Sequence, residues 1–343
     1  MKPPYQVTTR ILEQISSISE KVGEINSAYL YRPPTELRRK NRIKTIQSSL
    51  GIEGNSLSLD QVRAISDNKK VIAPEKDILE ARNAIKAYEN IDSYNHTSLT
   101  SFCKAHGILM HGLVENAGKI RTGSVGIIKG SVVTHVAPPG DVVKSLVREL
   151  FDYLKKSKDL LLLKSCVFHY EIEFIHPFTD GNGRIGRLWQ TVILRQYSPV
   201  FEFLPIESLI KARQAEYYRI LGESDNKGDS TGFIEFMLQI INESLEEILS
   251  NQNVNLTSQD RINIFKEKIG KSAFSRQDYM RHFKDISTAT ASRDLKLAVG
   301  NGILYKTGDK RTTSYKFKEY NPAPPLLSVS SKQLSTFRNH IIS

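Results

Sequence analysis

Residues 175–190, which read IHPFTDGNGRIGRLWQ, most constrain what this 343-residue chain can fold into. A segment rich in apolar residues ends there, and a polar turn follows before helical periodicity resumes. Gly181 and Gly183 reach backbone dihedral angles closed to other residues, and Asn182 tolerates them almost as well. The stretch therefore predicts a sharp loop that delivers its backbone N–H groups to the N-terminus of a helix.

Such a helix N-terminus suits phosphate oxygens, because free N–H groups and the helix dipole both favour an anion. Arg184 and Arg187 lie three apart on the first helical turn and can face the same anion. Asp180 would repel phosphates unless a divalent cation lies between them, so Mg²⁺ is expected. His176 is the nearby group able to take a proton near pH 7. Singly these residues say little, but together they predict phosphoryl or nucleotidyl transfer.

Elsewhere, apolar residues recur at helical spacing and predict a mainly α fold. The stripe from Ile11 to Ile25 is expected to pack on the protein's own core, with a dimer interface as the alternative. A helix after the Pro33-Pro34 pair carries a basic run, 38–44, that is expected on the surface. One stretch, Val125–Val136, predicts a β-hairpin. Further helices are expected at 76–93, 98–113, 141–157, 160–175, 184–197, 206–223 and 231–250.

The net charge of +11 is distributed unevenly along the chain. Residues 251–343 contain 16 Lys and Arg against 7 Asp and Glu, which leaves the first 250 residues close to neutral. This asymmetry favours two functional parts and makes the basic part a candidate for contact with nucleic acid.

The two cysteines, Cys103 and Cys166, lie in apolar segments with helical spacing. We expect both to be buried free thiols in a reducing cytosol. No apolar run approaches the length of a membrane span. We therefore expect a cytoplasmic protein that has no contact with a membrane.

The stretch from His176 to Arg187 resembles the HxFx(D/E)GNGRxxR motif of Fic-domain proteins at every defined position. The resemblance extends over roughly 30–250 and implies a helical bundle that splits ATP and joins AMP to a Ser, Thr or Tyr hydroxyl of a target protein. It implies His176 as the general base and Asp180 as the ligand of Mg²⁺. It also implies a phosphate-binding segment made of Asp180, Gly181, Asn182, Gly183, Arg184, Ile185, Gly186 and Arg187, with Arg187 nearest the γ-phosphate.

The same resemblance extends to the hairpin and to a later helix. In this family a hairpin flap aligns the target by strand addition, which implicates Val133, Thr134, His135 and Val136 at the nucleotide and target site. The Tyr217-Tyr218 pair and Asn226 resemble positions that border adenine and ribose. The spacing to Asn226 is one residue longer than the family pattern, and core packing is the alternative for the tyrosines.

A second motif lies upstream, where Ser49 to Gly54 matches the (S/T)xxxE(G/N) inhibitory helix of the same family. Alone, the pattern is common by chance, and Glu53 would be an ordinary surface acid. Beside a complete Fic motif it implies that Glu53 forms a bidentate ion pair with Arg187 where the γ-phosphate would otherwise bind. The same glutamate could instead orient a water and make the protein remove AMP.

The basic C-terminal part predicts three helices, with Ser275 as an N-cap, followed by two short strands around a polar turn. This order resembles a winged helix-turn-helix. Thr290, Ser292, Arg293 and Lys296 share a helix face suited to phosphates and base edges. Because winged helices also bind proteins, both partners stay open.

We thus expect an N-terminal helical region at 1–94, a Fic core at 95–250, a winged helix-turn-helix at 251–320 and a tail at 321–343. Three functions remain open. The favoured one is an autoinhibited protein adenylyltransferase that acts on a target and itself, and that could form a homodimer. The others are a nucleotide-sensing DNA-binding regulator with little turnover, and a Fic enzyme that removes AMP or moves phosphate or phosphocholine.

Overall fold

A computed structural model describes residues 4–27, 35–123, 126–129, 132–250, 256–283, 286–309 and 312–318. The chain divides into two compact units, Met1–Asn255 and Leu256–Ser343. Val125, residues 130–131 of the predicted hairpin turn and the predicted tail lie outside the described residues.

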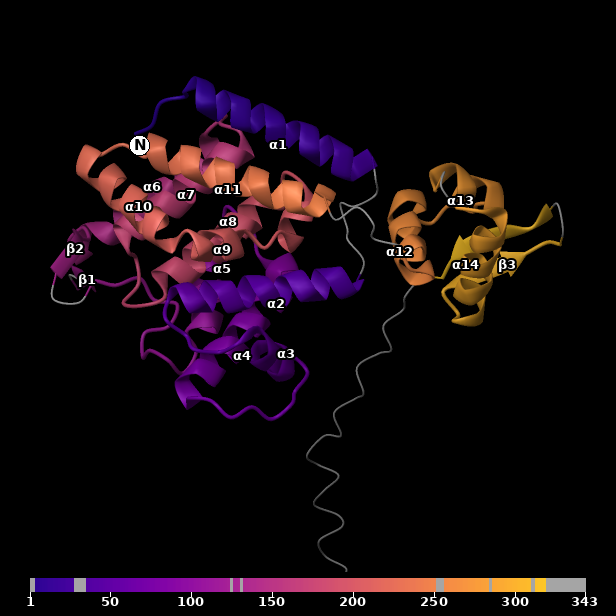
Figure 1. The fold of residues 1–343 in the computed structure, drawn as a ribbon, viewed down its shortest axis with the longest axis horizontal. Helices are drawn as coiled ribbons and strands as arrows, with labels where there is room; N and C mark the ends of the chain where they lie inside the picture. The colour runs from indigo at the N-terminus through magenta and orange to yellow at the C-terminus, as the bar shows by residue number, and fades with distance from the viewer. Residues whose placement is uncertain are drawn as a thin grey trace, which may run out of the picture. The chain divides into compact units, whose positions relative to one another are not determined.

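The first unit is mainly helical, as predicted, with one two-stranded antiparallel sheet (Figure 1). In chain order it contains α1 (Thr9–Ser27), α2 (Thr35–Ile52), α3 (Leu59–Ser66), α4 (Glu75–Glu89), the 3-10 helix η1 (Ile91–Ser93), α5 (Leu99–Leu109), β1 (Gly126–Lys129), β2 (Val132–Val136), α6 (Gly140–Lys156), α7 (Leu161–Ile175), α8 (Asn182–Leu194), the 3-10 helix η2 (Pro199–Phe203), α9 (Ile206–Ala212), α10 (Gln214–Lys227) and α11 (Thr231–Ser250).

Helices α7 and α8 form the centre of this unit and pack extensively on each other. Every residue of α8 is buried, and Trp189 on it meets the ring of Phe102 edge-on at 5.1 Å. A helix buried on all sides must pair each of its charged groups, because an unpaired buried charge is costly. The partners of Arg184 and Arg187 are therefore central to the site.

The apolar stripe of α1 packs on α11, and the two helices run side by side in Figure 1. Ile11, Ile18 and Ile25 are fully buried. The interpretation of the stripe as part of the protein's own core is confirmed, and these side chains are not available for a dimer interface.

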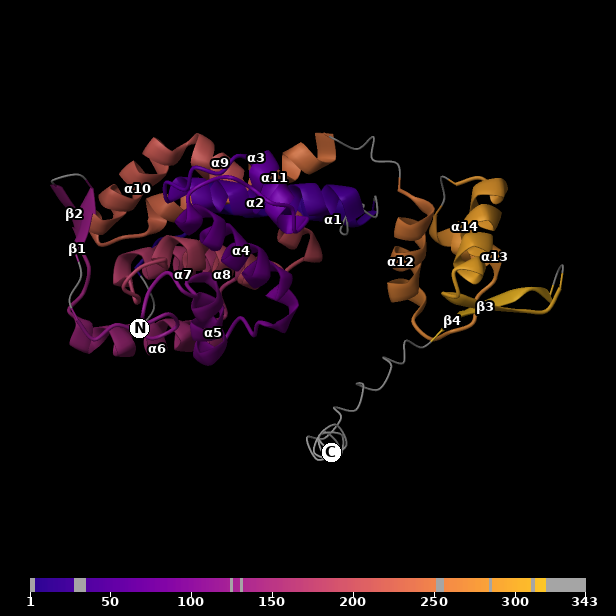
Figure 2. The ribbon, with the colours of Figure 1, turned by 90° about the horizontal axis from the view of Figure 1, so that it is seen from below.

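The hairpin pairs β1 with β2 in antiparallel register, Gly126 opposite Val136, with an irregularity between Ile127 and Ile128. It lies at one edge of the first unit in both views (Figures 1 and 2). Immediately after it, α6 begins at Gly140, where any side chain would collide with the carbonyl group of Thr122. The close approach of these two backbones requires glycine.

Several elements differ from the sequence-based expectation. The helix expected at 76–93 ends at Glu89 and is followed by η1, and the helix expected at 98–113 ends at Leu109. The helix expected at 206–223 is divided at Arg213, whose φ of −113° and ψ of 32° leave helical geometry between α9 and α10. Helix α3 was not predicted, although it has a sequence signal. Ser58 and Gln61 form a capping box at its N-terminus.

The second unit contains α12 (Ser258–Ile269), α13 (Arg276–His282), α14 (Thr288–Gly300) and the antiparallel strands β3 (Leu304–Thr307) and β4 (Ser314–Phe317). Ser275 caps α13 as predicted. Asp294 on α14 is fully buried and forms two hydrogen bonds with the guanidinium of Arg261, at 2.6 and 3.0 Å. No helix among the described residues of either unit is long and apolar enough to cross a membrane.

Candidate active site

His176 ends α7 in the left-handed region, with φ 52° and ψ 60°. Its Nδ1 lies 3.1 Å from the carbonyl oxygen of Glu173. A carbonyl oxygen only accepts, so Nδ1 carries the hydrogen and the lone pair of the neutral ring is on Nε2. The loop thus presents His176 in the tautomer that a general base requires.

Arg121, which the sequence motifs did not single out, holds this strained turn. Its guanidinium donates to the carbonyl oxygens of Ile175 and His176, at 3.1 and 2.7 Å. It also donates to Gly123 and Pro138, which flank the hairpin, at 2.6 and 2.8 Å. Burial lowers the pKa of Arg121 from its ordinary value. Arg121 therefore ties the base of the hairpin to the histidine loop.

Asn182 closes the loop on itself. Its Oδ1 accepts from the Phe178 N–H and its Nδ2 donates to the Phe178 carbonyl oxygen, both at 2.9 Å. Gly181 precedes it at a φ of 80°, and a Cβ there would lie 2.5 Å from the sulfur of Met110. The positive φ and the nearby Met110 side chain favour glycine at position 181, and the two bonds to Phe178 favour asparagine at position 182.

A buried histidine that no motif revealed supports the same loop. His106 Nδ1 accepts from the Gly118 N–H at 2.9 Å, so its Nε2 donates to the carbonyl oxygen of Asp180 at 2.8 Å. Its ring stacks on Phe178 with 3.6 Å between centroids. Burial lowers the pKa of His106 to about 4, which keeps the ring neutral at pH 7.

Arg184 pairs with carboxylates in the structure. Its guanidinium donates to Glu80 Oε1 at 3.0 Å and to Asp180 Oδ1 at 3.2 Å. Asn55, just after the upstream motif, donates to the other oxygen of Glu80 at 2.8 Å. The Nε of Arg184 is buried without a hydrogen-bond partner among the described residues. The Nε–H of this arginine is thus a buried donor that the described residues leave unused.

Arg187 contacts the upstream motif directly. Its Nε donates to Ser49 Oγ at 3.0 Å, and its Nη2 donates to the Ser49 carbonyl oxygen at 3.0 Å and to Glu53 Oε1 at 2.7 Å. The contact with Glu53 is thus one hydrogen bond, where a bidentate pair was expected, and Ser49 accepts from Nε and from the second N–H of Nη2. Burial opposes the charge of Arg187, but Glu53 and other anionic groups raise its pKa above the ordinary value.

The other residues predicted to bind nucleotide differ in how far they are buried. Tyr217 is buried beside Phe233 and its hydroxyl meets His169, so the core-packing interpretation describes it. Tyr218 is half-buried and Asn226 is exposed near the end of α10. Ile185 and Gly186 are buried within α8, and the backbone of Val133, Thr134, His135 and Val136 belongs to β2.

Asp180 is the residue that fits a metal. Its side chain is 54 % exposed, and Oδ1 accepts from the Gly181 N–H and from Arg184. Among the described residues, no cluster of three His, Cys, Asp or Glu could hold a metal ion alone. A single open carboxylate matches the way Mg²⁺ binds beside phosphates, with few protein ligands and several waters.

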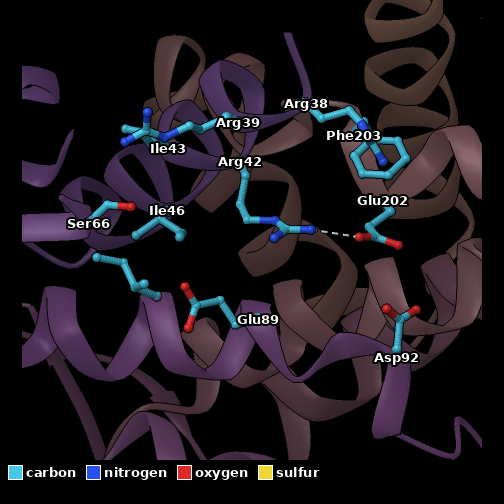
Figure 3. Close-up of a pocket in the computed structure, with 11 residues that line it drawn as sticks. Arg38, Arg39, Arg42, Ile43, Ile46, Ser66, Glu89, Asp92, Glu202 and Phe203 are labelled. Carbon is cyan, nitrogen blue, oxygen red and sulfur yellow. Dashed lines mark hydrogen bonds and ion pairs between the residues drawn. The ribbon is translucent and has the colours of Figure 1, made fainter. Parts of the chain in front are cut away.

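A charged cavity of about 560 Å³ flanks the N-terminal half of α2, away from the histidine loop (Figure 3). Arg42 donates to Glu202 at 2.8 Å, and the guanidinium of Arg38 lies 5.6 Å from the centre of the Phe203 ring. The lining residues are Arg38, Arg39, Arg42, Ile43, Ile46, Ser66, Ile85, Glu89, Asp92, Glu202 and Phe203. Three of the basic residues expected on the surface thus line a cavity whose opposite wall is acidic.

In the second unit, a groove of about 800 Å³ lies between α14 and the β3–β4 hairpin. Its basic lining residues are Arg276, Lys296 and Lys306, against one acid, Asp309. Arg293, predicted on the same helix face as Lys296, is also exposed. The described part of this groove is therefore basic.

The helical bundle, its edge hairpin and the histidine loop between α7 and α8 are those of a Fic fold. The sequence profile of the Fic/DOC family matches residues 96–194. The crystal structure of a Fic family protein from Desulfovibrio desulfuricans G20 is 37 % identical, with a TM-score of 0.72, and the match covers 94 % of this chain and 100 % of that one. The chain belongs to the Fic family.

Named relatives are more distant. The protein adenylyltransferase Fic of Nematostella vectensis is 27 % identical over 260 residues, which are 73 % of this chain and 58 % of the relative. The protein adenylyltransferase fic-1 of Caenorhabditis briggsae is 29 % identical over 257 residues, 66 % of this chain and 48 % of the relative. The chain spans about half the length of the curated relatives it matches.

Proposed function

We propose that this chain is an autoinhibited protein adenylyltransferase, which transfers AMP from ATP to a hydroxyl of a target protein and of itself. The observation that carries the proposal is the 2.7 Å contact between Glu53 and Arg187, beside a histidine with a free Nε2. The names of the relatives, protein adenylyltransferase Fic, support the same chemistry.

In the proposed reaction the target hydroxyl oxygen attacks the α-phosphorus of ATP. The bond from the α-phosphorus to the bridging oxygen breaks, and pyrophosphate leaves. His176 Nε2 takes the hydroxyl proton, and the ring orientation is held by Glu173 and Arg121 through backbone carbonyl oxygens. Asp180 would hold Mg²⁺, which would supply positive charge against the phosphates. Arg187 would bind the γ-phosphate, and the buried Nε of Arg184 offers a donor to the phosphate chain.

Inhibition follows from competition for Arg187. The residue is 1 % exposed, so a γ-phosphate can pair with it only if Glu53 leaves. The nucleotide would otherwise bind in a displaced position, with its α-phosphorus out of line for attack. Glu53 itself is 32 % exposed and follows the end of α2, so it can move without disturbing the core.

The test uses the intact mass of the protein after incubation with ATP and Mg²⁺. Glu53→Gly should gain AMP at least about 10-fold faster than the wild type, because it removes the carboxylate that occupies Arg187 and leaves this buried cation to the γ-phosphate. The double variant Glu53→Gly/His176→Ala should gain none. Equal rates for wild type and Glu53→Gly would remove autoinhibition, and a gain of phosphate in place of AMP would indicate another transfer reaction.

A second candidate function concerns the second unit, which we propose as a winged helix-turn-helix that contacts nucleic acid through its basic groove. Arg276, Lys296 and Lys306 support it. A mobility-shift titration with duplex DNA should show affinity that falls steeply with salt, and Lys296→Glu should weaken it about 10-fold. Affinity that is flat with salt would favour a protein partner.

A further inference from the structure

A second carboxylate faces the γ-phosphate subsite. Glu173 lies on the last turn of α7, and its side chain is 15 % exposed. A Cβ built on Gly183 would lie 3.2 Å from Glu173 Oε1 and 3.0 Å from Arg187 Nη1, and would collide with Glu53 Oε1. Two carboxylates and one guanidinium therefore surround the backbone of Gly183, at the helix N-terminus expected to bind phosphate.

Glu173 is held in place by a chain of buried hydrogen bonds. The Tyr217 hydroxyl lies 3.3 Å from Glu173 Oε1 and 3.0 Å from His169 Nε2. His169 Nδ1 lies 2.8 Å from Gln190 Oε1, which belongs to α8. Glu53 extends from the end of α2 and can leave, whereas Glu173 belongs to a core helix and cannot. A carboxylate therefore stays near Arg187 in both the inhibited and the released protein.

The charge of Glu173 is favoured by its surroundings. Burial raises the pKa of its carboxyl, but hydrogen bonding and charge from His169, then the charges of Arg187 and His176, lower the pKa below its ordinary value overall. A fixed anion opposes a second anion placed nearby, and the low-polarity interior strengthens this effect.

We propose that Glu173 is a specificity-determining residue for the phosphate chain, and that it opposes binding of a γ-phosphate at Arg187 independently of Glu53. The proposal rests on the proposed function, because it requires a nucleotide at this loop. A γ-phosphate brings more negative charge than a carboxylate, so Glu173 disfavours ATP more than it disfavours Glu53. Nucleotides that end at the β-phosphate reach less far toward Arg187 and are opposed less.

The test measures ATP and ADP binding by calorimetry to the full-length Glu53→Gly/His176→Ala protein, which has neither the inhibitory acid nor turnover. Adding Glu173→Gln should tighten ATP binding about 10-fold and ADP binding less than 3-fold. Glu173→Asp, which keeps the charge, should leave ATP binding as weak as in the parent protein. Glu173→Ala also removes the charge and should tighten ATP binding in the same direction, so the test does not depend on folding of the glutamine variant alone.

Glu171→Gln is the matched control. Glu171 lies two residues earlier on the same helix but lines a different cavity, with Leu146 and Phe174, so its substitution should leave both affinities unchanged. In the Glu53→Gly protein, Glu173→Gln should lower KM for ATP, and Glu171→Gln should leave KM unchanged.

ATP affinity that is the same with and without Glu173→Gln would overturn this inference alone. ADP affinity that rises as much as ATP affinity would overturn the γ-phosphate assignment. Absence of ATP binding in every variant would overturn the proposed function and this inference with it.

Discussion

The two ends of helix α2 are both held by arginine contacts, but in opposite environments. At the C-terminal end, Ser49 and Glu53 engage Arg187, whose side chain is 1 % exposed. At the N-terminal end, Arg42 pairs with Glu202 (Figure 3). Arg39 pairs with Asp67, and the side chains of Arg39 and Arg42 are 46 % and 33 % exposed.

Under the proposed function, the difference indicates which end of α2 should control the histidine loop. A buried charge that loses its partner is strongly destabilised, whereas exposed ion pairs contribute roughly 0–1 kcal/mol. The C-terminal end should therefore set the degree of inhibition, and the N-terminal end should only orient the helix. Each of the following substitutions tests this comparison.

The largest effect within this comparison is expected from Ser49→Ala. It removes the acceptor of Arg187 Nε but leaves the Ser49 carbonyl oxygen in place. A buried hydrogen bond to a charged group contributes about 1.5–3 kcal/mol, so α2 should dock less tightly. We expect AMP transfer to rise about 10-fold, measured by incorporation of labelled AMP.

The control for Ser49→Ala is the same substitution in the Glu53→Gly protein. There the inhibitory contact is already gone, so AMP transfer should change less than 2-fold. A 10-fold change in that background would mean that Ser49 acts on catalysis through Arg187 and not on inhibition.

A smaller effect on inhibition is expected from the protonation state of Glu207, which lies beside the middle of α2. Its side chain is buried, Oε2 has no hydrogen-bond partner among the described residues, and Oε1 accepts from the Tyr88 hydroxyl at 3.2 Å. Burial raises the pKa of Glu207 to about 7, from 4.5, although Arg187, Tyr88 and Thr45 act in the other direction.

The folded chain therefore keeps a proton that the unfolded chain releases between pH 4.5 and 7. The contribution of Glu207 to stability is fully present below pH 4.5 and is lost as the pH rises through 7. We expect the ratio of wild-type to Glu53→Gly transfer rates to rise about 3-fold from pH 6 to pH 8. Glu207→Gln should abolish this rise.

Glu171→Gln again provides a control, because burial also raises the pKa of Glu171 to about 7. Both substitutions should reduce the loss of thermal stability with rising pH, but only Glu207→Gln should change the rate ratio. A rate ratio that also flattens in Glu171→Gln would attribute the effect to general stability.

Much of the site follows from the sequence because its parts are local. The stretch from Gly181 to Arg187 combines two flexible glycines, the start of a helix and two arginines within seven positions. Such a local pattern can be recognised without knowledge of tertiary contacts. The mainly α fold could be predicted equally well, because the helical spacing of apolar residues predicts which face of a helix, such as α1, is buried.

The supporting residues could not be predicted in the same way. His106 is 74 residues from the carbonyl group it holds, and Arg121 is 55 residues from the His176 carbonyl oxygen. Neither belongs to a spaced motif, and each acts on backbone oxygens that every residue has. The Glu80 partner of Arg184 was missed for the same reason, because only the packing of α4 on its neighbours brings the two together.

The smallest effect is expected at the exposed end of α2. Arg42→Gln removes the 2.8 Å pair with Glu202, but Arg195 still lies 3.3 Å from that carboxylate, so no buried charge is left alone. Stability should fall by less than about 1 kcal/mol, and AMP transfer should change less than 2-fold. The difference in stability between the wild type and Arg42→Gln should vanish at about 0.5 M salt, because salt then screens exposed charges within a few ångströms. Thermal unfolding and labelled-AMP incorporation at low and high salt check this. Activation by Arg42→Gln as large as by Ser49→Ala would mean that inhibition depends on the whole helix and not on its buried end.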